Sequence, residues 1–319
     1  MTRLVPRLEL NIITGFLGSG KTTLLKRHLQ SQSAGSTLVI INEFGRESID
    51  DRITLHLKSE IETIADGCLC CTVLDQLRDM LLSILTRRAK GELKNLQRII
   101  IETSGLADPG PILGTIRSDE NLDEYLILGP CITTFDALEG VKSLEQFNEA
   151  ASQLAAADRV IVTKTDLADS HRLEHLTSVI RTINPACEVT LNDVPEFIFA
   201  PVSDLLPENS GQVAISKTHA HTGNVRSFST VLSNSVDWAT FSVWLTALLN
   251  RHGNHILRFK SVLAVRDSGK LVVQGVRHRV YPPYHLPAED DPDDVSRLVF
   301  ITDGIEDQRI IESLHRLTQ

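Results

Sequence analysis

The sequence lacks an apolar run of the length that a membrane-spanning helix requires, which argues against an integral membrane protein. It also lacks a surplus of basic residues: 32 Lys and Arg stand against 41 Asp and Glu, and the formal net charge is −9. Because the basic residues are also scattered, we expect neither nucleic acid nor a membrane among the partners. The first residues have no apolar core typical of a signal peptide, so we expect a cytoplasmic protein.

Cysteine is scarce, and its distribution does not suggest a disulfide framework. Three of the five cysteines stand within four positions, as Cys68, Cys70 and Cys71, before an apolar pattern that predicts a helix over 73–90. A helix N-terminus lowers the pKa of a thiol, and thiolates are zinc ligands. We predict a metal site of these three ligands, whose fourth ligand is not evident nearby; three buried or redox-active thiols are the alternative.

The composition is that of an ordinary globular protein, with 42% hydrophobic and 23% charged residues. A length of 319 residues favours about two domains. Periodicity disappears where Pro, Ser, Gly and Asn accumulate before residue 225. We therefore expect a first domain over 1–205, a linker over 206–224 and a second domain over 225–319.

One stretch fits the phosphate-binding loop pattern G-x-x-x-x-G-K-[ST] without a gap. An apolar strand is predicted before it over 8–14 and an amphipathic helix after it over 21–32, which is the order that the loop needs. Glycines allow backbone N–H groups to surround phosphate oxygens, a lysine adds charge, and a hydroxyl reaches magnesium. The predicted contacts to the nucleotide are Gly15, Gly18, Ser19, Gly20, Lys21, Thr22 and Thr23.

Acidic residues follow two further predicted strands, and ligands of open α/β sheets bind at such carboxyl ends. Glu43 follows a strand over 37–42; it could reach a nucleotide-bound magnesium or be a solvated loop residue, and the pattern leaves both open. Glu102 closes an apolar strand over 98–102, three residues before Gly105. This spacing suits a second phosphate-loop motif, in which Glu102 holds magnesium through water and the Gly105 amide contacts the γ-phosphate.

The strand predicted over 159–162 leads into Thr163, Lys164 and Asp166. At this point phosphate-loop GTPases carry N-K-x-D, whose Asp pairs with guanine while the Lys stem packs on the base. Thr163 replaces the Asn of that motif, but Lys164 and Asp166 keep its spacing. We favour guanine over adenine; an ordinary Asp at the start of a helix is the alternative.

In this order the motifs GFLGSGKTT, NEFG, GCLCC, ETSGLADP and TKTD resemble those of the CobW-type metallochaperone GTPases, and the resemblance spans nearly the whole chain. It implies GTP hydrolysis coupled to transfer of a metal, usually zinc, to a client metalloprotein, so GTP, Mg²⁺ and Zn²⁺ would be bound. The client is unknown, and a homo-oligomer is an open possibility.

Many relatives have Glu where this chain has Arg46. The implied roles are zinc ligation by Cys68, Cys70 and Cys71, magnesium binding by Thr22, Glu43 and Glu102, catalysis by Lys21, Glu43 and Glu102, and guanine recognition by Lys164 and Asp166.

We therefore predict an α/β protein: a doubly wound, mostly parallel P-loop GTPase domain followed by a small α+β domain. The second domain is expected to contain strands over 225–232, 256–265, 270–276 and 296–302 and helices over 237–251 and 306–317. A single helix over 143–157 is expected in the first. No glutamine or arginine finger is evident, which predicts slow intrinsic hydrolysis. Two alternatives remain: a nucleotide-switched scaffold with a structural or redox cysteine loop, and a small-molecule P-loop ATPase or kinase.

Overall fold

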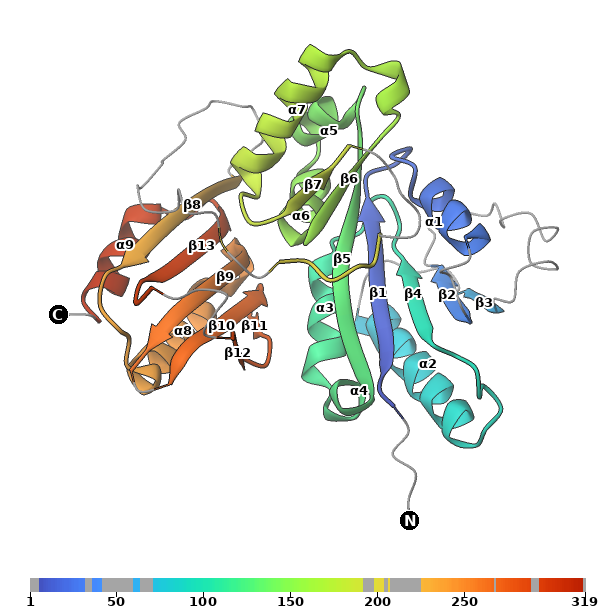
Figure 1. Ribbon diagram of the computed structural model, residues 1–319, viewed down its shortest axis with the longest axis horizontal. Coiled ribbons are helices and arrows are strands. Elements are labelled where there is room, and N and C mark those ends of the chain that lie inside the picture. The colour runs from blue at the N-terminus through green and yellow to red at the C-terminus, as the bar shows by residue number, and fades with distance from the viewer. Residues whose placement is uncertain are drawn as a thin grey trace. The chain divides into compact units, whose positions relative to one another are not determined.

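The computed structural model describes residues 6–31, 36–41, 60–63, 71–191, 198–203, 206, 225–266, 268–287 and 293–317, without the side chains of 60–63 and 71–73 (Figure 1). The chain divides into two compact units. The first comprises residues 1–143, 157–173 and 188–202, and the second comprises 144–156, 174–187 and 203–319. The domain bounds expected from the sequence, 1–205 and 225–319 with a linker over 206–224, stay a prediction.

The first unit is built on a seven-stranded sheet in the order β3-β2-β4-β1-β5-β6-β7, and each pairing that the structure describes in it is parallel. Apolar runs form its central strands because a parallel sheet is covered on both faces; Leu10 and Ile12 on β1 are fully buried. The predicted doubly wound domain is confirmed. The strands are β1 (Leu8–Gly15), β2 (Thr37–Ile41), β3 (Glu60–Thr63), β4 (Arg98–Glu102), β5 (Leu126–Asp136), β6 (Arg159–Thr163) and β7 (Glu188–Thr190).

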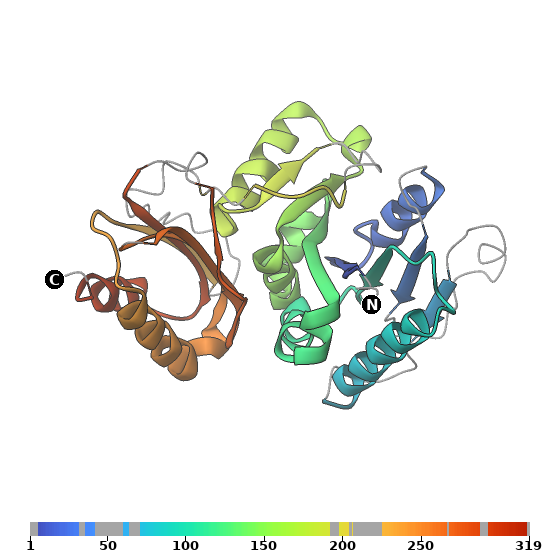
Figure 2. The same cartoon turned by 60° about the horizontal axis from the view of Figure 1, so that its bottom comes forward.

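Helices cover both faces of this sheet, with α1 (Lys21–Gln30) and α2 (Cys71–Ala89) on opposite sides in Figure 2. Leu24, Leu25 and Leu29 of α1 pack in one cluster with apolar residues of β1, β2, β4, β5 and β6. Further along the chain are α3 (Pro109–Ser118), α4 (Glu120–Tyr125) and α7 (Ser170–Ile183). Among the described residues, no helix has the length and apolar character needed to cross a bilayer.

The order of the strands reverses on either side of β1, since β4 lies against one edge of β1 and β5 against the other. In an open α/β sheet, such a reversal leaves a crevice outside the carboxyl ends of the strands, where ligands bind. The phosphate-loop sequence follows β1 directly. The topology therefore places this sequence at the binding edge of the sheet.

The single helix predicted over 143–157 is wrong, because the chain forms two helices there. These are α5 (Gly140–Gln146) and α6 (Asn148–Ala156), with Phe147 between them. Leu144 and Leu154, one on each helix, are both buried. The apolar spacing predicted helix on both sides of Phe147 but carried no signal for the break, since Phe is an acceptable helix residue.

The second unit contains an antiparallel sheet in the order β11-β10-β9-β13-β8, with β12 also paired to β10. This confirms the predicted small α+β domain, including the hairpin of β9 and β10. The strands are β8 (Val225–Leu232), β9 (Ile256–Val265), β10 (Gly269–Val276), β11 (Arg279–Val280), β12 (Tyr284–His285) and β13 (Ser296–Asp303), and the helices that follow β8 and β13 are α8 (Trp238–His252) and α9 (Asp307–His315).

Aromatic side chains form the centre of the core between this sheet and its two helices. The ring of Phe300 stacks on Phe228 at 5.2 Å and on Phe259 at 6.0 Å, and Trp244 of α8 meets it edge-on at 6.5 Å. Such ring pairs stabilise a core beyond the area that they bury. The tryptophan-bearing face of α8 is thus packed against the core.

Replacing Phe300 by Ala is expected to lower the free energy of unfolding by about 3–5 kcal/mol, because the ring is 1% exposed and its loss leaves a cavity. Urea unfolding followed by tryptophan fluorescence measures the change. Val243→Ala on α8 is the control: this side chain is 71% exposed, and we expect a change within about 0.5 kcal/mol. Equal stabilities of the two variants would contradict the assignment of Phe300 to the core.

Candidate functional site

The loop between β1 and α1 brings a lysine side chain to the start of a helix. Lys21 opens α1 and turns back over the loop, with its Nζ 2.9 Å from the carbonyl oxygen of Gly15 and 3.2 Å from that of Phe16. Gly20 stands at the N-cap with φ 92°, so no side chain there accepts hydrogen bonds from the first-turn amides. A helix N-terminus with a buried ammonium beside it attracts phosphate.

Two glycines are required here because neighbouring chain passes too close for a side chain. At Gly15, where φ is 138°, a Cβ would lie 2.4 Å from Thr134 Oγ1 on β5. At Gly105, a Cβ would lie 2.6 Å from Leu17 Cδ2 and 2.8 Å from the Leu17 amide nitrogen. The segment after β4 therefore lies directly against the phosphate loop, and the fold brings the predicted residue Gly105 to that loop.

Thr22 and Glu102 meet although 80 residues separate them. The Thr22 hydroxyl donates to Glu102 Oε1 at 2.5 Å. Glu102 is only 2% exposed at the end of β4, whereas Thr22 lies half-buried in the first turn of α1. A hydroxyl and a carboxylate are oxygen ligands of the kind that Mg²⁺ prefers. Their contact places two of the predicted magnesium residues together.

Thr163 ties the end of β6 to the phosphate loop. Its hydroxyl donates to the backbone oxygen of Ser19 at 2.8 Å. The Ser19 hydroxyl in turn shares a hydrogen bond of 2.7 Å with the hydroxyl of Thr134 on β5. The residue that replaces Asn in the predicted base-reading motif thus holds the end of β6 against the phosphate loop.

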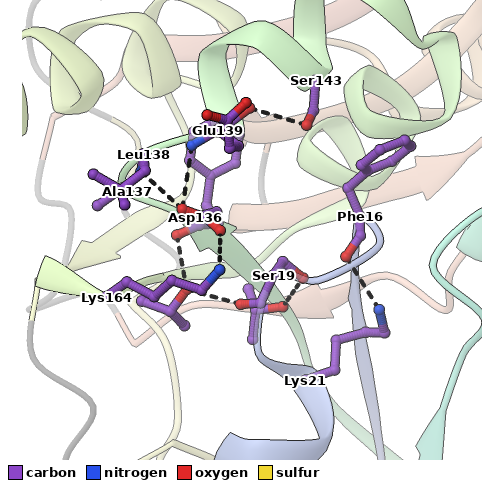
Figure 3. A network of polar contacts seen from close by, with 12 residues as sticks. Phe16, Ser19, Lys21, Asp136, Ala137, Leu138, Glu139, Ser143 and Lys164 are labelled. Carbon is purple, nitrogen blue, oxygen red and sulfur yellow. Dashed lines mark hydrogen bonds and ion pairs between the residues drawn. The ribbon is translucent and has the colours of Figure 1, made fainter. Parts of the chain in front are cut away.

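Lys164 follows in a left-handed conformation, with φ 56°, and its Nζ lies 2.5 Å from Asp136 Oδ2 at the end of β5 (Figure 3). Burial alone would raise the pKa of Asp136, but hydrogen bonds from Lys164 and from the amides of Leu138 and Glu139 hold that pKa below its usual value. The carboxylate is therefore charged at neutral pH. Asp166 lies exposed in the short 3₁₀ turn Thr165–Leu167.

Several predicted site residues lie outside the described part of the chain. These are Glu43, Cys68 and Cys70; Cys71 begins α2, but its side chain is not described. Their proposed roles in magnesium and zinc binding stay predictions. The roles of the described loop and strand-end residues stay predictions as well, although their positions are now known.

No sequence motif assigned Asp136 or Thr134 to the site. Asp136 closes an apolar strand in the same way as Glu102, so the signal was present, but no motif named it. Thr134 lies within the buried part of β5, and only the parallel register with Gly15 brings it to the loop. The first could have been found from strand-end chemistry; the second required the fold.

Comparison with known proteins matches the chain to two family models. The CobW/HypB/UreG nucleotide-binding domain covers residues 9–190, and the cobalamin synthesis protein CobW C-terminal domain covers 225–318. The zinc chaperone YjiA of Escherichia coli K12 is 32% identical over 311 residues, which are 95% of this chain and 96% of that protein.

Two further similarities differ in extent. The crystal structure of zinc-bound YjiA GTPase from E. coli superimposes with a TM-score of 0.77 at 28% identity, covering 98% of this chain and 99% of that one. The zinc-regulated GTPase metalloprotein activator 1 of Schizosaccharomyces pombe is 32% identical over 204 residues, or 60% of this chain. The match spans about half of that protein, 48%.

Removal of the Thr163 hydroxyl tests the tether between β6 and the phosphate loop. Thr163→Val keeps the shape of the side chain but loses the hydrogen bond to Ser19, so we expect the free energy of unfolding to fall by about 1 kcal/mol. Thr163→Ser keeps the hydroxyl and serves as the matched variant. Chemical denaturation of both measures the difference; identical unfolding curves would show that the tether contributes nothing.

Proposed function

This chain belongs to the CobW/HypB/UreG family of nucleotide-binding proteins, and we propose that it is a GTP-hydrolysing, zinc-binding metallochaperone that delivers metal to a client protein. GTP binding and hydrolysis would control the affinity for zinc. Zinc is the cargo in this proposal, and the client is a metalloprotein of unknown identity.

One juxtaposition carries the proposal: three segments remote in the sequence meet at one edge of the parallel sheet. The Thr22–Glu102 hydrogen bond joins the phosphate loop to the end of β4, and the Thr163–Ser19 hydrogen bond joins it to the end of β6. A phosphate site, a carboxylate for magnesium and a base-reading segment are the three parts that a nucleotide hydrolase requires.

The residues present fit a magnesium ion. Thr22 and Glu102 offer a hydroxyl and a carboxylate oxygen within 2.5 Å of each other beside the anion-binding loop. When bound there with GTP, Mg²⁺ would neutralise charge that develops on the phosphate oxygens. Glu43 is proposed as a further ligand from the segment after β2.

The chain's own contribution to hydrolysis would be positioning and electrostatic stabilisation. The ammonium of Lys21 and the first-turn amides of α1 would hold the β- and γ-phosphates and stabilise the transition state. The Gly105 amide, held against Leu17, would contact the γ-phosphate, and Lys164 and Asp166 would bind guanine. Without a glutamine or arginine finger in this set, the intrinsic rate would be low.

The cysteine loop would hold the cargo. Cys68, Cys70 and Cys71 follow β3 and precede or open α2, and β3 ends at the same edge of the parallel sheet as β4, which ends in Glu102. Relatives of this chain are named zinc chaperones, which supports zinc as the ion carried. The zinc affinity of such a segment could depend on whether GTP or GDP is bound, provided that the two nucleotide states differ in their contacts to it.

Glu102→Gln tests the proposed magnesium and catalytic role. The amide oxygen can still accept from Thr22, but the negative charge is lost, so we expect kcat for GTP to fall by about 100-fold and Mg²⁺-dependent GTP binding to weaken. Phosphate release and titration with a fluorescent GTP analogue measure the two effects. The control is Glu9→Gln, which removes a carboxylate of the same sheet that pairs with Arg98 at 2.8 Å and lies away from the nucleotide edge. Wild-type turnover by the Glu102 variant would refute the assignment.

Replacing Cys68, Cys70 and Cys71 by Ala tests the cargo site. We expect the variant to lose zinc binding in the GTP-bound state, and the wild type to bind zinc about 5- to 150-fold differently with a GTP analogue than with GDP. Competition with a chromogenic chelator measures both. Cys187→Ala, at a half-buried cysteine of the second unit, is the control.

Three outcomes would favour an alternative over the proposal. Unchanged zinc stoichiometry after loss of the three cysteines, or equal zinc affinity in both nucleotide states, would leave a scaffold rather than a chaperone. Displacement of bound GTP by equimolar ATP would instead indicate an ATPase or kinase. Preference for GTP together with nucleotide-dependent zinc affinity is the result that we expect.

A further inference from the structure

We propose that Asp136 is a positioning residue for guanine recognition: it holds the Lys164 side chain in one conformation at the base site. This inference rests on the proposed function, because it concerns how the same site selects its nucleotide. It adds to that function a residue that no sequence motif assigns. Asp136 ends β5, and Lys164 directly follows β6.

The two residues are brought together by strand register. Asp136 pairs with Thr163 in the parallel ladder of β5 and β6, so Lys164 is the first residue beyond that pair. The left-handed backbone of Lys164, unusual for a residue with a side chain, turns the chain there. Figure 3 shows the Lys164 ammonium directed at Asp136, with Ser19 of the phosphate loop close by.

Asp136 is itself held rigidly, which is what a positioning residue requires. Its Oδ1 accepts from the amides of Leu138 at 2.7 Å and Glu139 at 3.2 Å, while Oδ2 faces Lys164. The Asp136 side chain is 9% exposed, whereas that of Lys164 is 41% exposed. A fixed, buried carboxylate therefore restrains a lysine that solvent would otherwise leave free to move.

The turn that carries Asp136 is anchored from two further directions. The amide of Ala137 donates to the Thr163 backbone oxygen at 3.0 Å. The Arg172 guanidinium, from the first turns of α7, donates to the Ala137 oxygen at 3.0 Å and also to the Leu138 oxygen. The segments that would contact the base thus form one hydrogen-bonded body with the phosphate loop, through Thr163 and Ser19.

Restraint of Lys164 has a consequence for binding. A long lysine side chain loses rotamer freedom when its stem packs on a ligand, and this loss weakens affinity. With its ammonium held by Asp136, Lys164 has lost that freedom before the base arrives. Asp136 would then improve guanine affinity without contacting the phosphates, so KM or Kd would change while kcat would not.

Asp136→Asn is the direct test, because the amide keeps an oxygen for the Leu138 and Glu139 amides but loses the charge that holds Lys164. We expect GDP and GTP affinity to fall about 3- to 10-fold, with kcat at saturating GTP unchanged. Titration with fluorescent guanine nucleotides and steady-state hydrolysis give the two values. Glu139→Gln, on the same turn but in an exposed pair with Lys142, is the matched control and should bind as wild type.

A double-mutant cycle with Lys164→Ala distinguishes positioning from general support of the fold. If Asp136 acts through Lys164, adding Asp136→Asn to the Lys164→Ala variant has no further effect on guanine affinity. Additive losses, or wild-type affinity of the Asp136→Asn variant, would overturn the proposal. If the Asn variant melts at a lower temperature, Asp136→Glu is the second variant: it keeps the charge that holds Lys164, so we expect it to bind guanine nucleotides more tightly than Asp136→Asn does, and equal weakening of both would overturn the proposal.

Failure of the guanine site and failure of the Asp136 role give different results. If the wild type binds ATP as tightly as GTP, the proposed guanine site is wrong, whatever the variants do. If the wild type prefers guanine but the cycle shows no coupling between Asp136 and Lys164, only the positioning role is lost. We expect the wild type to prefer guanine nucleotides and both single variants to bind them more weakly. The double variant should bind them no more weakly than Lys164→Ala alone.

Discussion

The hydrogen-bonded register of the parallel sheet is the constraint on which the rest of the site depends. It sets Gly15 opposite Thr134, and Asp136 opposite Thr163, at neighbouring strand ends. Because all seven strands run the same way, the segments that follow β1, β4, β5 and β6 leave the sheet at one edge. A change of register by one residue would turn these side chains to the other face and separate them.

Tethers between the strand-end segments make this edge a single body. Gly105 packs against Leu17, and the Thr163 hydroxyl binds the Ser19 backbone. The phosphate loop is therefore in contact with the segments on both of its sides. A nucleotide that engages the loop, Glu102 and Lys164 would act on parts that are already connected.

Much of the fold was predictable because the patterns that specify it are local. Val225–Leu232 and Ile256–Val265 were predicted to the residue, because the first alternates between apolar and polar residues and the second runs into the hairpin turn signal Asp-Ser-Gly at 267–269. The break at Phe147 was missed, because both flanking segments have helical spacing and nothing in the local chemistry marks the junction. The short strands β3, β7, β11 and β12 carry too few residues to show a period, so pairing partners decide them.

The sequence by itself determined the chemistry: a phosphate loop needs its glycines, lysine and threonine in contiguous order, and that order can be read without coordinates. Only the tertiary structure decided the partners of these groups. Thr22 donates a hydrogen bond to Glu102, 80 positions away in the chain, and Lys164 donates one to Asp136, 28 positions away. The physical reason is that such contacts come from strand order and register, which depend on the whole core, whereas motifs depend only on the covalent neighbours that the chain supplies.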